Sequence, residues 1–339
     1  DHEISPDWTV AGSPFFGFAT DLNTKKFRLA FAAFLPNGFG ADLPENEPSR
    51  YHSLRTWFIA SRATAAAAYE ISDRFAVGAT VSVIHAYIKA KRFVNTSVFS
   101  DPDNRFLPAS ETAEGDHLLE LAGQDFTWAV DLGVLFKHLD TLRIGASFAG
   151  GSAAELEGDV KLKYTTGELE TTRHHTEIVI PFTLRAGVNW EATDRFEMGF
   201  DVRYWHYQVF QEQRSVLDEP LLNGLLSELS AAKNYGNSWN IGLGVMHHTT
   251  DDLDFMVGFR KDFTPIPNQT LTLENPSRNT HSLSGGVRWQ CDDNIRLGMS
   301  LVRGWFDLAN VQNSLTVPPT NIKARGGNLT VGLDLLYQL

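Results

Sequence analysis

The sequence predicts an all-β fold, a transmembrane antiparallel β-barrel in which about thirteen strands are present. Three observations support this fold class. Apolar and polar residues alternate over segments of about ten residues or more, the length that a tilted strand needs to cross a bilayer. Short polar turns alternate with long connections along the chain. Aromatic residues gather near the ends of the alternating segments, as in the interfacial girdles of membrane barrels.

The segment FEMGFDVRY (196–204) shows the alternation without a slip. Phe196 and Phe200 fall on one face of an extended chain, whereas Glu197 and Asp201 fall on the other, because successive side chains of a strand point to opposite faces. In a soluble sheet the apolar face would pack on a core. Here the opposite face mixes charge with glycine, which suits a wet lumen, so we expect the apolar face to meet lipid.

The same pattern predicts the strands in order along the chain. Their first residues lie near positions 13, 26, 54, 74, 118, 141, 176, 195, 237, 253, 281, 294 and 326. Short turns are expected at 21–26, 71–74, 138–140, 191–194, 249–252 and 291–294. Long loops are expected at 36–53, 93–117, 150–175, 211–236, 264–280 and 307–325. Turns at one end and loops at the other are typical of outer-membrane barrels, with periplasmic turns and extracellular loops.

The number of predicted strands indicates that one strand of the barrel is missing. Single-chain bacterial barrels have an even number of strands, because antiparallel neighbours must close the ring. The first and last predicted strands would run in the same direction. We therefore expect residues 13–22 and 326–339 to flank a gap, or a strand supplied from elsewhere. One upward strand before residue 1 would complete a fourteen-stranded barrel from a single domain that spans residues 1–339.

Composition excludes several classes of function. The net charge of −12 argues against nucleic acid as a partner, because phosphate binding needs a basic surface. The single cysteine, Cys291, excludes an internal disulfide framework and argues against a zinc cluster. Residues 101–105, His174–His175 and His247–His248 lack ligand spacing on a shared face, so we expect no metal and no cofactor. No Ser/His/Asp arrangement stands out, and we assign no catalytic residue.

Four local motifs occur in an order that carries a family resemblance. They are AAAAYEISDRFAVGATVSVIHAYIKAKRF (65–93), GQDFTWAVDLGVLFKHLDTLRIGASF (123–148), IPFTLRAGVNW (180–190) with its strand proline Pro181, and FRKDFTPIP (259–267). In this order they resemble the FadL/TodX family of outer-membrane long-chain fatty-acid and hydrocarbon transporters. Members of that family begin with a plug-like hatch that bears Asn-Pro-Ala and precedes the first strand. Neither the hatch nor that strand is in this chain, which agrees with the strand count.

The resemblance implies passive transport in the bacterial outer membrane. Long-chain fatty acids or related hydrocarbons would be captured by extracellular loops and passed through the lumen or a lateral opening into outer-membrane lipid. An alternative is a FadL-like scaffold barrel that binds partner proteins in secretion or surface assembly, and an enzyme built into a barrel wall is a further alternative. A partner protein or an N-terminal segment would close the barrel.

The expected loops at 93–117 and 211–236 contain many apolar residues for exposed segments, and they are the candidate capture site. The alternative is that these loops merely pack on each other. Asp218 and the leucines that follow it recur at helical spacing, which predicts a short helix over 218–232. The candidate ligand-binding residues are Phe93, Val98, Phe99, Phe106, Leu107, Leu221, Leu222, Leu225 and Leu226.

Charged residues on inward faces are the second group of candidates. Arg185 and Asp201 are expected near each other, as a structural ion pair. Arg288 and Arg296 are expected near Asp334, where two arginines against one aspartate would leave positive charge to hold a carboxylate, unless they only brace the wall.

The third candidate is a lateral opening in the strand at 27–40. In the family, a kink in the corresponding strand opens a side window toward the membrane. Small residues on the lumen side leave room here, Pro36 lacks a backbone donor, and Gly38 relaxes the backbone. The alternative is that Pro36 merely ends the strand. The residues of the candidate opening are Ala30, Ala32, Phe34, Pro36 and Gly38.

Overall fold

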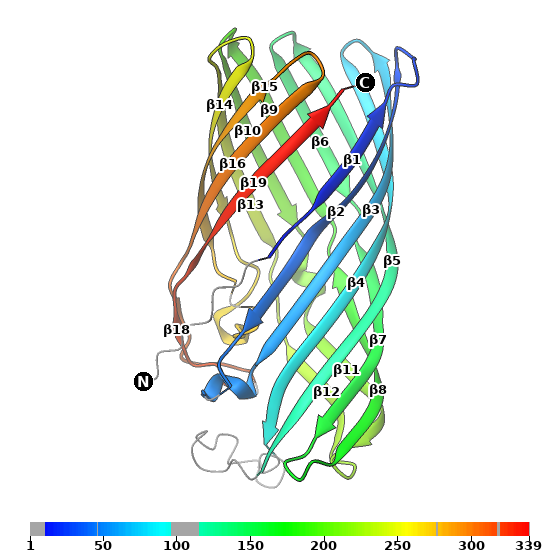
Figure 1. Cartoon of the computed structure of the whole chain (residues 1–339), viewed down its shortest axis with the longest axis vertical. Helices are drawn as coiled ribbons and strands as arrows, with labels where there is room; N and C mark the ends of the chain where they lie inside the picture. Colours follow the sequence, from blue (N-terminus) through cyan, green and yellow to red (C-terminus); the bar gives the residue numbers. More distant parts are fainter. Residues whose placement is uncertain (1–10, 46, 96–114, 276, 317–318, 339) are drawn as a thin grey trace.

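The computed structural model describes residues 11–338, apart from 46, 96–114, 276 and 317–318, and shows a tall barrel wall of antiparallel strands (Figure 1). Thirteen strands make up the wall and correspond in order to the predicted ones. They are β1 (Phe15–Thr20), β2 (Phe27–Asp42), β3 (Arg55–Ser72), β4 (Phe75–Asn95), β5 (Asp116–Leu139), β6 (Leu142–Ala149), β9 (Thr183–Thr193), β10 (Phe196–Trp205), β13 (Ser238–His248), β14 (Leu253–Asp262), β15 (Thr280–Gln290), β16 (Ile295–Phe306) and β19 (Gly327–Tyr337).

The outside of the wall is apolar. On β5, Phe126 and Trp128 are each 67% exposed, whereas the alternate residue Ala129 is 2% exposed and faces inward. Directly paired residues share a face, so Phe200 of β10 lies beside Leu243 of β13 on the outside. The outward faces therefore form a continuous apolar belt, and the inside-out arrangement predicted from the alternation is confirmed. Among the described residues, no helix is both long and apolar enough to cross a membrane.

The two edges of the wall lie side by side without pairing. β1 pairs with β2, and β19 pairs with β16, but among the described residues no ladder joins β1 to β19. Figure 1 shows the two strands next to each other and pointing in the same direction. This arrangement is the gap that the strand count predicted, since an antiparallel neighbour must lie between two strands of the same direction.

Two hairpins extend the wall at the end that carries the long loops, which we call the loop end. They are formed by β7 (Ser152–Lys163) with β8 (Leu169–Ile180), and by β11 (Glu212–Leu221) with β12 (Leu226–Ala232). β7 pairs with the first part of the wall strand β5, residues 118–124, and β8 pairs with β11. The loops expected at 150–175 and 211–236 are thus largely strands, and that prediction was wrong. Their alternation is real, but it continues beyond the membrane.

The predicted helix over 218–232 was also wrong, because the segment is the β11–β12 hairpin. Leu221 pairs with Leu226 across a turn in which Leu222, Asn223 and Gly224 have positive φ angles. Asp218 is no helix cap, and its carboxylate lies 3.0 Å from the ring of His175 on β8. The helix prediction failed because leucines on both sides of a tight turn have the same sequence spacing as the apolar face of an amphipathic helix.

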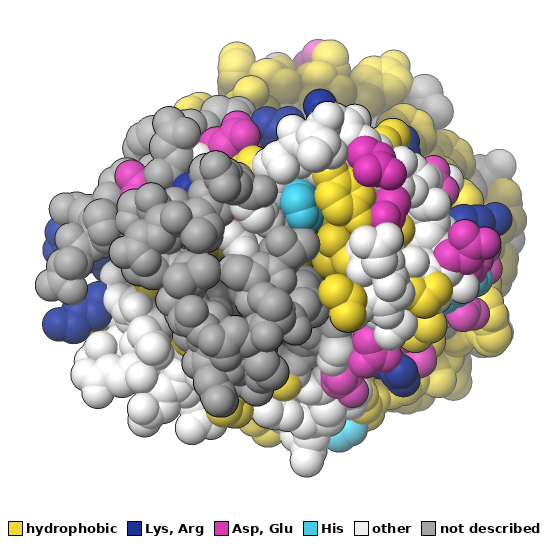
Figure 2. Space-filling view, turned by 90° about the horizontal axis from the view of Figure 1, so that it is seen from below, with side chains coloured by type: hydrophobic (Ala, Val, Ile, Leu, Met, Phe, Trp, Pro, Cys, Tyr) yellow, Lys and Arg dark blue, Asp and Glu magenta, His cyan; other side chains and the backbone are white. Residues whose placement is uncertain are grey.

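The main hydrophobic core lies at the loop end, between the hairpins and β4 and β5. Leu156, Val160 and Leu162 of β7 are fully buried there, together with Leu119 and Leu121 of β5. Figure 2 shows this end of the molecule, where acidic side chains surround an apolar strip. The remaining elements are short: η1 (Pro48–Tyr51), η3 (Tyr207–Val209), η4 (Asn268–Thr270), β17 (Ala309–Asn310) and β18 (Lys323–Ala324).

Candidate functional site

A cavity of about 500 Å³ lies inside the barrel toward the loop end, and we call it the loop-side cavity. Its wall comes from inward positions of β3, β4 and β5, which alternate with outward ones, and from the segments around η3. The apolar lining includes Phe58, Ala60, Ile88, Leu119, Leu121, Ile178, Ile180, Pro181, Tyr207, Phe210, Leu229 and Tyr235. The charged or titratable lining includes His52, Lys91, Arg92, Lys233 and Glu274.

Arg92 brings an uncompensated charge to this cavity. It lies opposite Leu119 in the β4–β5 ladder and has no hydrogen-bond or ion-pair partner among the described residues. Burial lowers the pKa of its guanidinium, while Glu274 raises it. Glu274 is already paired, since Lys233 Nζ lies 3.4 Å from its Oε1. Arg92 is therefore free to bind an anionic group of a ligand.

His52 adds a polar group without charge. Burial, and then the nearby Arg92, lower the pKa of its imidazole to about 4. At neutral pH the ring is therefore uncharged, and its Nδ1 lies 3.2 Å from Thr320 Oγ1. Lys91 is compensated by Glu120, whose Oε1 lies 3.2 Å from its Nζ. The rest of the charged lining holds two positive charges, on Arg92 and Lys233, and one negative charge, on Glu274. The balance around Arg92 is thus positive by one charge.

A bulge in β2 lies beside this cavity. Leu35 and Pro36 together face the single residue Ser61 of β3, because the register shifts between Phe34 and Asn37. The ladder to β1 ends at the same level, with Phe15 opposite Phe34. Two residues against one is the arrangement of a β-bulge, which bends a strand and interrupts its ladder.

The bulge separates two cavities. Pro36 lines the loop-side cavity, and Leu35 lines a second cavity of about 470 Å³, which we call the wall pocket. The wall pocket reaches the outside of the barrel, since it is also lined by the exposed side chains of Phe16, Val83 and Phe126. Leu35 and Pro36 therefore lie between the loop-side cavity in the lumen and the wall pocket on the outside.

The structure corrects the position of the candidate opening. Ala30, Ala32 and Phe34 lie in uninterrupted ladders to both β1 and β3, so these residues leave no gap in the wall. Pro36 does not end the strand, which continues to Asp42. Gly38 pairs with Ile59 beyond the bulge. The irregularity is thus confined to the step from Leu35 to Pro36.

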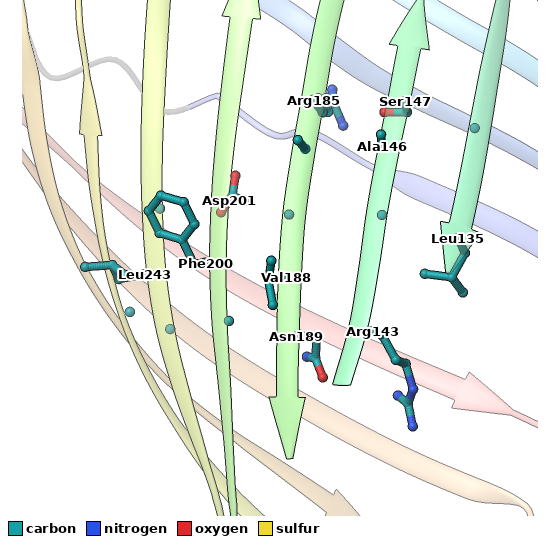
Figure 3. A pocket seen from close by; sticks show the side chains of 18 of the residues that line it. Leu135, Arg143, Ala146, Ser147, Arg185, Val188, Asn189, Phe200, Asp201 and Leu243 are labelled. Atoms are coloured by element: carbon teal, nitrogen blue, oxygen red, sulfur yellow. The ribbon is translucent and has the colours of Figure 1, made fainter. Parts of the chain in front are cut away.

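A third cavity, of about 1050 Å³, occupies the lumen toward the short turns, and we call it the turn-side cavity. Figure 3 shows Arg143, Arg185, Asn189 and Asp201 among its lining residues. Arg185 and Asp201 share this cavity, but they form no ion pair within 4.0 Å, and Arg185 lies directly opposite Arg203. The expected pair of Arg185 with Asp201 is therefore absent from the described residues.

Charged side chains lie between the loop-side and turn-side cavities. Arg62 Nη2 lies 2.5 Å from Asp131 Oδ2, and Thr80 donates to the same carboxylate at 3.0 Å. Arg62 follows Ala60, which lines the loop-side cavity, by two positions on the same face of β3. The floor of the loop-side cavity is therefore bordered by an ion pair.

The expected cluster of Arg288, Arg296 and Asp334 does not form. Arg288 binds Asp254, which lies directly opposite on β14, with Nη2 2.7 Å from Oδ2. Arg296 donates to Gln290 Oε1 at 2.7 Å, and Asp334 lies opposite Gly298. The charge of Arg288 is compensated by Asp254, and Arg296 is held by the neutral side chain of Gln290, so the two arginines do not converge on Asp334.

The predicted ligand-binding residues of the loops lie in different places. Val98, Phe99, Phe106 and Leu107 lie outside the described residues. Leu221, Leu222 and Leu226 are buried in the core at the loop end, whereas Leu225 at the hairpin turn is 64% exposed. Phe93 lies near the guanidinium of Arg50, at 6.0 Å from its ring centre. None of the described members of this set lines the loop-side cavity.

Sequence reasoning missed Arg92 and the aromatic residues near η3. β4 was expected to end near residue 92, so its last residues were not assigned to a face. Continuing the even-numbered inward positions Ile84 and Ile88 would have placed Arg92 inside. The aromatic residues Tyr207, Phe210 and Tyr235 lie in irregular segments, where no period assigns a face.

Known proteins support this architecture. Residues 7–332 match the family model of outer membrane transport proteins described as OMPP1/FadL/TodX. A putative outer membrane protein of Neisseria meningitidis serogroup B is 20% identical over 224 residues, which cover 61% of this chain and 48% of that protein. This chain thus spans about half the length of that curated relative.

Solved structures share the fold at low identity. A Pseudomonas aeruginosa FadL homologue has a TM-score of 0.78 at 15% identity, with 95% of this chain and 76% of that chain covered. The P. putida toluene transporter TodX has a TM-score of 0.73 at 14% identity, covering 96% and 81%. With the family match over most of its length and an apolar belt around its wall, this chain belongs to the OMPP1/FadL/TodX family of transport proteins of the bacterial outer membrane.

Proposed function

We propose that this protein carries amphipathic hydrophobic molecules with an anionic head, such as long-chain fatty acids, from the loop-side cavity through the bulge in β2 into membrane lipid. The observation that carries the proposal is that the loop-side cavity and the wall pocket flank the same two residues, Leu35 and Pro36. A structural relative is named as a toluene transporter, and another as a monoaromatic hydrocarbon channel, CymD. Both names agree with a hydrophobic cargo.

Apolar burial supplies the affinity for the chain of the ligand. The cavity volume of about 500 Å³ falls in the range of about 300–1,000 Å³ that is usual for small-molecule sites. Each methylene moved from water into an apolar lining contributes about 0.8 kcal/mol. Capture therefore requires no energy source, and we propose binding and passage without a chemical step.

The head group explains the charged part of the lining. Arg92 has no ion-pair partner among the described residues, and Lys233 compensates Glu274. A carboxylate beside Arg92 would gain a charge-assisted hydrogen bond in a mostly apolar site. Arg92 thus replaces Arg288 and Arg296 as the residue that we propose for carboxylate binding.

A sideways exit follows from the charges below the cavity. A hydrocarbon chain that moved toward the short turns would meet the Arg62–Asp131 ion pair and then the turn-side cavity, whose lining includes Arg143, Arg185 and Asp201. A chain that moved past Leu35 would reach the wall pocket and the apolar belt. Most residues that line the second route are apolar, although Arg62 and His85 also border the wall pocket. An open route of this kind distinguishes a transporter from a scaffold with a closed lumen.

Removal of the bulge tests this proposal. Deletion of Pro36 leaves Leu35 alone opposite Ser61 and restores a regular register between β2 and β3. We expect fatty-acid uptake into cells or lipid vesicles to fall at least tenfold, with binding in the loop-side cavity retained. Pro36→Ala keeps two residues opposite one and is the matched control, with uptake near that of the unmodified protein. Unchanged uptake after the deletion would refute a lateral route at this bulge.

A further inference from the structure

Exposed cations lie where β14 and β16 end, and before β19 begins, at the loop end of the wall. Figure 1 shows how these three strands lie in the wall. Lys261 of β14 follows the exposed residues Val257 and Phe259 on the outward face. Arg303 of β16 follows Leu301 on the same side of the wall, and it is exposed. Both residues therefore lie at the edge of the lipid-facing surface.

Two further cations continue this group before β19. Lys323 and Arg325 are exposed, whereas the alternate residues Ile322 and Ala324 pack against a buried cluster inside. β18 pairs with β17 in a separate ladder, so the outward side is assigned to Lys323 and Arg325 from their exposure and from the inward packing of Ile322 and Ala324. We call Lys261, Arg303, Lys323 and Arg325 the outer basic group.

The cations of this group are not neutralised by nearby carboxylates. None of the four forms an ion pair among the described residues. Asp307, which follows β16, is already shared, since it lies 3.3 Å from His281 and accepts a hydrogen bond from Asn279 at 3.1 Å. The four cations thus have no ion-pair partner among the described residues, in a chain whose net charge is −12.

Aromatic and apolar side chains fix the depth of the group. The guanidinium of Arg303 lies 5.8 Å from the ring centre of Trp305, and Lys261 Nζ lies 5.1 Å from that of Phe263. Arg303 is directly opposite Leu283 and Leu329, which are 51% and 53% exposed on the outside. Tryptophan is typical of the membrane–water interface, and long cationic side chains next to lipid extend toward its head groups.

From this placement we propose that the outer basic group binds the phosphate groups of a lipid in the surrounding outer leaflet. The acyl chains of that lipid would lie on Leu283, Leu301 and Leu329, directly below the cations. A phosphorylated head group provides the negative charge that the protein does not, and basic clusters at the membrane surface bind anionic head groups. The continuity of cations with an apolar surface favours a lipid over a free phosphate ion.

Lipid binding to the purified protein in detergent tests the proposal. Native mass spectrometry would follow titration with diphosphorylated lipid A, with the same lipid after removal of its phosphates, and with inorganic phosphate. The variant is Lys261→Gln/Arg303→Gln/Arg325→Gln. Each cation near an anionic head group contributes about fivefold to affinity, so the triple variant should bind diphosphorylated lipid A about a hundredfold more weakly. Binding of the phosphate-free lipid should be weak and unchanged.

A matched control removes two other exposed lysines, Lys161 and Lys163 of β7, which form no ion pair with a described carboxylate. The control variant is Lys161→Gln/Lys163→Gln, which leaves the outer basic group intact. The control should bind diphosphorylated lipid A like the unmodified protein. If the triple variant does not fold, Arg303→Gln alone should weaken binding about fivefold. Equal binding by the variant, an equal loss in the control, or equal affinity for the phosphate-free lipid or inorganic phosphate would each overturn the proposal.

Discussion

Substitution of Arg92 by Gln is the most informative perturbation of the loop-side cavity. Gln keeps a polar side chain of similar length but removes the positive charge. In the unmodified protein, Arg92 and Lys233 face Glu274, and Lys233 Nζ is 3.4 Å from that carboxylate. After the substitution the charges of Lys233 and Glu274 balance, so the local surplus that would attract a carboxylate is lost.

The magnitude follows from the surroundings of Arg92. A hydrogen bond to a charged group contributes about 1.5–3 kcal/mol to a folded protein or complex. Arg92 breaks no protein hydrogen bond to make this contact, because it has none among the described residues. We take about 2 kcal/mol, which corresponds to a dissociation constant about thirty times larger.

Equilibrium binding of a long-chain fatty acid to the detergent-solubilised protein is the assay, at a pH where the carboxylate is ionised. The primary alcohol of the same chain length provides the uncharged comparison, and its affinity should change less than threefold. Arg92→Lys should restore most of the fatty-acid affinity. Arg214→Gln, on the exposed Arg214–Glu228 pair of β11, is a control that should leave both affinities unchanged. Equal losses for acid and alcohol would refute a role of the Arg92 charge.

Three further predictions concern the loop end. Gly158→Ala would place a Cβ 1.9 Å from the carbonyl oxygen of Ala122, so the β5–β7 junction must shift, and we expect a loss of about 1–3 kcal/mol, measured by denaturant unfolding or protease resistance. Leu162→Ala removes a fully buried side chain and should cost about 2–5 kcal/mol in the same measurement. The pKa of His52 is lowered to about 4, so between pH 6.5 and 4 the unfolded state binds a proton that the folded state does not. Stability should therefore fall as the pH decreases through that window, and His52→Gln should make the fall of the thermal midpoint shallower.

The barrel wall was predictable because the membrane imposes a strict period of two. Because one face meets lipid and the other a wet lumen, few residues depart from this period. FEMGFDVRY, which forms residues 196–204 of β10, is an example. Beyond the membrane this contrast ends, although strands continue. In β7, Leu156 is buried and its neighbours Glu155 and Glu157 are exposed, which is an ordinary half-buried strand pattern that a loop assignment concealed.

Partners across strands were less predictable, because they depend on register. The alternation places Arg288 on the inward face but does not say which acidic residue of a neighbouring strand it meets. In the structure Asp254 of β14 lies directly opposite Arg288, whereas Asp334 of β19 lies opposite Gly298 of β16. The bulge in β2 was only partly foreseen. Pro36 indicated a weak point, but the number of residues on each side, two against Ser61 alone, appears only in the paired structure.

Photo-crosslinking of a fatty acid during uptake tests the lateral route most directly. A photoreactive amino acid would replace Leu35, which lines the wall pocket, or Asn189, which lines the turn-side cavity. The account predicts that cells or vesicles taking up a labelled fatty acid give a strong crosslink at position 35 and little at position 189. Crosslinking at position 189 with none at position 35 would contradict it, because the molecule would then travel down the lumen.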